Sequence, residues 1–66
     1  MKVIVNGEPR HIDERATLAS LLEQLEFAAK HFAVEVNFEV VPRREHTEYL
    51  LQDGDRLEIV SLVGGG

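Results

Sequence analysis

The last three residues of this chain are the strongest candidates for chemistry. Gly64, Gly65 and Gly66 are three of its five glycines, and they follow directly on an apolar segment. Because glycine has no Cβ, a Gly-Gly end can thread a narrow channel in another protein and present its α-carboxylate with little steric hindrance. That carboxylate, with a pKa of about 3.5, is ionised and unreactive until it is activated, for instance as an acyl-adenylate. The ATP and magnesium for such a step would come from a partner, because no glycine-rich loop joins a strand to a helix here.

The side chains offer no conventional active site. His11, His31 and His46 have no helical i,i+4 pairing and no ligand partner at a fixed spacing, so we expect all three on the surface. Asp53-Gly54-Asp55 has two carboxylates one residue apart but lacks the other oxygen ligands of a calcium loop, so we expect a plain turn. The chain has no cysteine, which removes any thiol nucleophile or thiolate metal site. We therefore expect no catalytic residue and no metal site.

Length and charge narrow the function further. The chain has 66 residues, 44% hydrophobic and 29% charged, which is typical of one small globular domain. Its net charge of −5 argues against nucleic acid as a partner, because phosphate binding needs clustered Lys and Arg. No apolar run approaches the roughly 20 residues that span a bilayer, and no leader opens the chain. We expect a soluble cytoplasmic protein, and its small core weighs against an enzyme.

The elements that must position the glycine tail begin with a hairpin and a helix. The β-branched run at residues 1–5 is closed by Asn6-Gly7, and a brief edge strand should follow at about residues 10–13. Thr17 is the expected helix N-cap. Leucines then recur at helical spacing, at Leu18, Leu21, Leu22 and Leu25, and we expect the helix to end nearer Glu26 than residue 31.

Three further strand signals complete the pattern. They cover residues 33–37, residues 40–41 after a tight turn through Asn37-Phe38-Glu39, and residues 57–63. This order predicts an α+β fold, with a mixed sheet of four to five strands and one helix packed across one face. The first and last strands are the most apolar, so we expect them to be central neighbours. Residues 1–63 would form the domain, and residues 64–66 a flexible C-terminal tail.

Apolar residues on the uncovered face of that sheet could form a docking patch. Ile4 in the first strand, with Val60 and Leu62 in the last, alternates away from the expected core. If these strands are neighbours, the three side chains would gather into one patch that leads into the tail. Acidic Glu58, Asp53 and Asp55 nearby would suit a partner with a basic rim.

Six short motifs follow one another along nearly the whole chain, and together they resemble a known family. They are Val3-Ile4-Val5-Asn6-Gly7, Thr17-Leu18 with Leu21-Leu22, Val34-Glu35-Val36-Asn37, Val40-Val41-Pro42-Arg43, residues 51–60 and the Gly65-Gly66 end. In order, spacing and total length they resemble the ThiS family of sulfur carrier proteins of thiamin biosynthesis. The resemblance implies the ubiquitin-like β-grasp fold.

The resemblance also implies a mechanism. An E1-like adenylyltransferase of the ThiF type would join AMP to the carboxylate of Gly66. Sulfur from a cysteine desulfurase or a related donor would convert it to a thiocarboxylate, and a ThiG-type thiazole synthase would take that sulfur for the thiazole of thiamin. Gly66 would be the covalent site and Gly65 its required neighbour. The chain would be a protein cosubstrate that binds no cofactor itself and has no nucleic-acid or membrane partner.

Several alternatives stay open at this point. The glycines could be no more than a frayed end. The same fold and tail would suit a sulfur carrier for molybdopterin or another pathway, or a modifier that tags proteins. The domain could also be a non-covalent β-grasp interaction module in which the tail is incidental.

Overall fold

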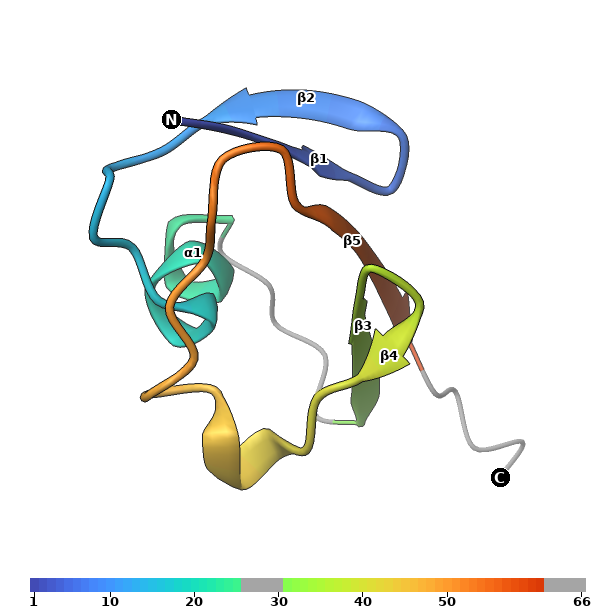
Figure 1. Ribbon diagram of the computed structural model, residues 1–66. Coiled ribbons are helices and arrows are strands. Elements are labelled where there is room, and N and C mark those ends of the chain that lie inside the picture. Colours follow the sequence, from blue (N-terminus) through green and yellow to red (C-terminus); the bar gives the residue numbers. More distant parts are fainter. Residues whose placement is uncertain (26–30, 62–66) are drawn as a thin grey trace.

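The computed structural model describes residues 1–25 and 31–61, which form a five-stranded sheet and two short helices (Figure 1). The strands are β1 (Lys2–Val5), β2 (Glu8–His11), β3 (Phe32–Val36), β4 (Glu39–Val40) and β5 (Arg56–Ser61). The helices are α1 (Leu18–Gln24) and the 3₁₀ turn η1 (Arg43–Glu45). The strand order is β2-β1-β5-β3-β4, in which only β1 and β5 run parallel. The predicted mixed sheet, with its first and last strands as neighbours, is confirmed.

The β1–β2 hairpin is closed by the two residues that the sequence indicated. Asn6 and Gly7 have φ values of 49° and 85°, the left-handed conformation at both central positions that matches the twist of a hairpin. Because this turn uses only two residues, pairing resumes at once, with Glu8 opposite Val5. The prediction that the return strand covers residues 10–13 is therefore wrong, since β2 begins at Glu8.

A proline inside β2 is accommodated because β2 lies at the edge of the sheet. Met1 and Ile12 exchange both of their backbone hydrogen bonds, at 2.7 and 2.8 Å. Antiparallel pairs alternate between bonded and non-bonded positions, so Pro9, opposite Ile4, falls at a non-bonded one. The missing N–H of the proline thus costs no hydrogen bond in the sheet, and the predicted edge position is confirmed.

Helix α1 begins at a capping box. Thr17 has an extended backbone, and its Oγ1 accepts a hydrogen bond from the N–H of Ser20 at 3.1 Å. Ser20 returns the contact, because its Oγ accepts from the N–H of Thr17 at 2.9 Å. Together the two side chains satisfy two backbone donors that a helix leaves without partners. The helix ends at Gln24 with Leu25 as its C-cap, close to the expected Glu26.

The core lies between α1 and one face of the sheet. Figure 1 shows α1 on one side of the strands. Its buried leucines share one cluster with the inward side chains of three strands; the members from the helix and these strands are Leu18, Leu21, Leu22, Val3, Val5, Val34, Val36, Leu57 and Ile59. The opposite sheet face has no helix across it among the described residues. Within the same part of the chain, no helix is long and apolar enough to cross a membrane.

Candidate functional site

Strand β5 is the element that precedes the glycine tail, and it is held from both sides. It lies in the middle of the sheet, in register with β3 from Leu57 to Ser61. On the β1 side, Oδ1 of Asn6 accepts a hydrogen bond from the backbone N–H of Ile59 at 2.8 Å. These contacts make β5 a fixed base for whatever follows it. The predicted site residues Leu62, Gly64, Gly65 and Gly66 lie outside the described residues, so their roles stay predictions.

Ile4 and Val60 share the uncovered sheet face, but they are not neighbours on it. The parallel pairing places Ile4 opposite Arg56, at the start of β5. Val60 is four residues further along β5, or about 13 Å at the usual rise of a strand. Glu58 lies between them on the same face. Val60 is 48% exposed, whereas Ile4 is partly buried. These two residues therefore do not form the single apolar patch that the sequence suggested.

Two carboxylates meet in the middle of this face. Glu35 of β3 lies directly opposite Glu58 of β5 in the antiparallel register. Side chains at such positions have Cβ atoms about 5 Å apart, and like charges there destabilise a sheet. Arg56 is a basic residue on the same face of β5. Glu39 of β4 lies opposite the buried Val36, so its side chain is on the other side of the sheet. The surface is thus acidic where the sequence placed Glu58.

The two aspartates before β5 have structural roles. Asp55 is only 8% exposed, and its two carboxylate oxygens accept hydrogen bonds from Nδ2 of Asn37 at 3.0 Å and from the N–H of Gln52 at 2.8 Å. Oδ1 of Asp53 accepts from the N–H of Lys2 at 2.8 Å. The expectation that Asp55 borders a docking surface is wrong, because its carboxylate is buried and fully used in holding the loop.

The turn between β3 and β4 presents an aromatic ring that sequence reasoning did not assign to a site. Asn37 and Phe38 are its central residues, with left-handed φ values of 52° and 71°. Phe38 is 79% exposed, the most exposed of the large apolar side chains that the structure describes. A bulky residue with positive φ is an outlier, since glycine or asparagine is usual there. The signal in the sequence was the dipeptide itself, in which phenylalanine follows asparagine at a tight turn.

His46 is buried, which corrects the expectation that all three histidines lie on the surface. It is 6% exposed, and its Nε2 lies 3.0 Å from the carbonyl oxygen of Val41, so this nitrogen carries the proton and donates it. Its ring lies against Phe32, with centroids 6.2 Å apart, and the guanidinium of Arg43 lies 4.5 Å above the same phenylalanine. The other two histidines are exposed, as predicted. His46 therefore belongs to the packing of the domain.

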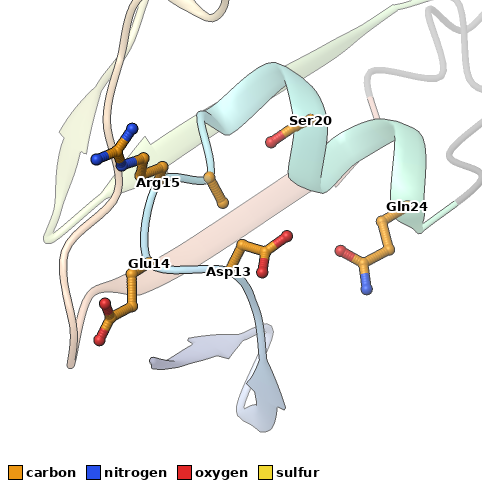
Figure 2. Close-up of a pocket in the computed structure, with 6 residues that line it drawn as sticks. Asp13, Glu14, Arg15, Ser20 and Gln24 are labelled. Carbon is orange, nitrogen blue, oxygen red and sulfur yellow. The ribbon is translucent and has the colours of Figure 1, made fainter.

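A hollow of about 610 Å³ lies beside the N-terminal end of α1 (Figure 2). Five of the six residues that line it are polar; the six are Asp13, Glu14, Arg15, Ala16, Ser20 and Gln24. Figure 2 shows Asp13 and Gln24 facing the hollow, whereas Glu14 and Arg15 point outward. The hydroxyl of Ser20 is committed to the capping box, where it also donates to the carbonyl of Thr17 at 2.8 Å. The hollow thus contains no free nucleophile beside a base.

Comparison with known proteins adds to this geometry. Residues 3–66 match the model of the ThiS family. The chain is 39% identical over 64 residues to the sulfur carrier protein ThiS of Thermus thermophilus, covering 97% of this chain and 98% of that one. It is 29% identical to the sulfur carrier protein ThiS of Escherichia coli over the whole of both chains. The crystal structure of a thiamine biosynthesis protein (ThiS) from Geobacter metallireducens superimposes over the whole of both chains, with a TM-score of 0.86 and 36% identity.

A second kind of relative is much longer. The thiazole synthases of Paramagnetospirillum magneticum and Magnetococcus marinus are 41% and 42% identical to this chain over all 66 residues. The chain spans only 20% of the length of each. In those proteins a domain of this kind and further sequence form one polypeptide.

Fold and comparisons together define the class of protein. A mixed sheet with β1 and β5 parallel at its centre, crossed on one face by a single helix, is the ubiquitin-like β-grasp fold. The chain belongs to the ThiS family.

Proposed function

We propose that this protein is a sulfur carrier of thiamin biosynthesis, and that the carboxylate of Gly66 carries the sulfur. The observation that carries the proposal is the match of the family model, which extends through the glycine tail to residue 66. The sulfur carriers of two bacteria match the chain over all or nearly all of their own length. Within the described residues, Asp53, Asp55, Ser20 and His46 are engaged in holding the fold, and Asp13 has no nucleophile beside it in the hollow.

The carboxylate of Gly66 is unreactive, so it must be activated before it can accept sulfur. An E1-like adenylyltransferase of the ThiF type supplies ATP and magnesium, the carboxylate of Gly66 attacks the α-phosphorus of ATP, and pyrophosphate leaves. The outer sulfur of a persulfide on a cysteine desulfurase or a related donor then attacks the acyl carbon and displaces AMP. A thiol reduces the resulting acyl disulfide, which releases the thiocarboxylate and leaves a disulfide on the donor side. A ThiG-type thiazole synthase consumes this sulfur. The chain is a cosubstrate in each step, and it binds neither the nucleotide nor the metal itself.

The thiazole synthase relatives support a ThiG-type thiazole synthase as a partner of this chain. A domain of this kind forms a fifth of their length, so in those proteins it stays close to whatever the remaining sequence builds. Two domains in one polypeptide have a high effective concentration relative to each other. This favours the transfer of sulfur between a carrier domain and an enzyme that must meet in every turnover. The body of the present domain contributes a fixed base for the tail, through the contacts that hold β5.

ATP–pyrophosphate exchange with a ThiF-type enzyme tests this proposal. We expect exchange with the full chain, no exchange after deletion of Gly66, and strong loss in Gly65→Val, because a side chain next to the last residue obstructs a narrow channel. Glu14→Gln, on the loop beside α1, is the control and should exchange normally. Full exchange by the chain without Gly66 would refute the proposal. A thiocarboxylate that forms but is not consumed by thiazole synthase would assign the carrier to another pathway.

A further inference from the structure

We propose that Phe38 is an aromatic anchor with which this domain docks into an apolar pocket, bordered by Arg or Lys side chains, on thiazole synthase. The inference rests on the proposed function and names a contact surface for one of its partners. It concerns the turn between β3 and β4, which the reaction of Gly66 does not use.

The backbone of this turn favours glycine, yet the chain has phenylalanine there. Phe38 has a φ of 71°, a left-handed conformation that bulky side chains rarely adopt. The β1–β2 turn provides an internal comparison, because it too places asparagine first, with Gly7 second at a φ of 85°. The β1–β2 turn thus has glycine, the residue with the least strain, at its second central position. Phe38 occupies the same position in the β3–β4 turn, where its backbone is strained, and its ring is not buried. Strain that packing does not explain is a feature of functional positions.

The turn is also rigid at its base. The N–H of Asn37 donates to the carbonyl of Arg56 at 2.7 Å, and its Oδ1 accepts from the N–H of Arg56 at 3.1 Å. Its Nδ2 donates to the buried carboxylate of Asp55. These three bonds hold the residue that precedes Phe38, so the ring is attached to a backbone that is already ordered. An anchor presented in this way loses little conformational entropy when it binds.

The surroundings of the anchor indicate the chemistry of the pocket. Val40 follows on β4 and is 65% exposed, which extends the apolar contact. Glu35 lies directly opposite Val40 on the same sheet face, and Glu58 lies opposite Glu35 on β5. Arg56 is the one basic residue among these sheet positions, so carboxylates prevail. An aromatic side chain beside such charges fits an apolar pocket with a basic border, where each carboxylate gains a partner.

The position of the turn relative to the tail fits a partner that engages both. Asn37 is bonded at the start of β5, whereas the tail follows its other end at Ser61. The six residues of β5 separate the two points by about 17 Å, at the usual rise per residue. A partner can thus hold the domain at Phe38 while the glycines enter its active site. The thiazole synthases that contain a domain of this kind support the choice of thiazole synthase as this partner.

Equilibrium titration of thiazole synthase tests this surface. We expect Phe38→Gly to raise the Kd at least about tenfold, as truncation of a central aromatic anchor does, and Phe38→Leu to recover part of the affinity. Leu50→Ala is the matched control, since Leu50 is also apolar and 62% exposed, and its Kd should change less than about twofold. The melting temperature of Phe38→Gly should be equal to or higher than that of the unmodified chain, because glycine accepts the positive φ.

Two further readouts identify the partner and separate this inference from the proposed function. An unchanged Kd in Phe38→Gly, or an equal loss in Leu50→Ala, would overturn the anchor. A loss confined to binding of the adenylyltransferase would overturn the choice of thiazole synthase. Thiocarboxylate formation, followed by intact mass, should proceed normally in Phe38→Gly. If the unmodified chain forms no thiocarboxylate while Phe38→Gly still weakens binding, the proposed function fails and the docking surface stands.

Discussion

The side-chain amide of Asn37 donates a hydrogen bond to the buried carboxylate of Asp55 across 3.0 Å. This contact ties the β3–β4 turn to the loop that leads into β5. It fixes the β3–β4 turn, which presents Phe38, relative to the start of β5.

Replacing this carboxylate should destabilise the fold. Asp55→Asn retains one acceptor but places an amide where the second donor points, so we expect the free energy of unfolding to fall by about 1.5–3 kcal/mol. Urea denaturation at neutral pH measures the change. Asp53→Asn is the control, because that exposed side chain keeps an oxygen for the N–H of Lys2. An equal fall in unfolding free energy in both variants would show that the buried carboxylate of Asp55 stabilises the fold no more than the exposed one of Asp53.

The capping box predicts a smaller effect at the start of α1. Thr17→Ala removes the acceptor for the N–H of Ser20, and we expect a loss of about 1 kcal/mol in unfolding free energy. Thr17→Ser keeps a hydroxyl at the same place and should retain most of the stability. Thermal unfolding followed by circular dichroism compares the two. A loss in the serine variant as large as that in the alanine variant would argue against the cap.

The opposed pair Glu35 and Glu58 should lower the stability of the fold and strengthen the binding of thiazole synthase. Glu58→Lys places a positive charge opposite Glu35, and we expect the unfolding free energy to rise by about 0.2–1 kcal/mol at low salt. The gain should shrink as salt screens the pair. The same variant should bind thiazole synthase more weakly, whereas Glu23→Lys, on the exposed side of α1, should not. A variant that is neither more stable nor weaker in binding would contradict the role given to this pair.

The single tyrosine gives a direct reading of the local electrostatics. Burial raises the pKa of Tyr49 above its ordinary value, and the negative charges of Asp55 and Glu39 raise it further. The folded state therefore holds the phenolic proton more tightly than the unfolded state. Its contribution to stability is complete below the unfolded pKa of about 10 and is lost as the pH rises through the folded pKa.

Phenolate absorbance can follow this titration without overlap, because the chain has one tyrosine and no tryptophan. We expect the midpoint for Tyr49 to lie above that of the chain in denaturant, and to move down in Glu39→Gln. Tyr49→Phe should remove the corresponding fall in stability at high pH. A midpoint at or below the denatured value would contradict the local environment described for this ring.

Periodicity in the sequence was sufficient to predict the elements and their buried faces. The leucines of α1, the capping residue Thr17 and the alternation in β1 and β5 each depend on neighbours close in sequence, and the structure confirms them. Apolar end strands also sufficed to place β1 beside β5. Such local patterns determine which face a side chain takes, and hence the fold.

The register of the strands and the geometry of the turns could not be predicted from these local patterns. Alternation places Ile4 and Val60 on the same face, but only the parallel register shows that Glu58 lies between them. His46 is buried through contacts with Phe32 and Val41, whose proximity follows from the path of the chain between β4 and β5. The strain at Phe38 is a property of the backbone, and the sequence shows only the unusual residue.

Intact mass spectrometry of the chain, after incubation with a ThiF-type adenylyltransferase, ATP and a sulfur source, tests the central claim most directly. The account predicts a mass increase equal to the difference between one sulfur and one oxygen atom, localised by fragmentation to Gly66 and reversed when thiazole synthase and its substrates are added. An unchanged mass under conditions in which a known sulfur carrier is converted, or sulfur found on any other residue, would contradict it.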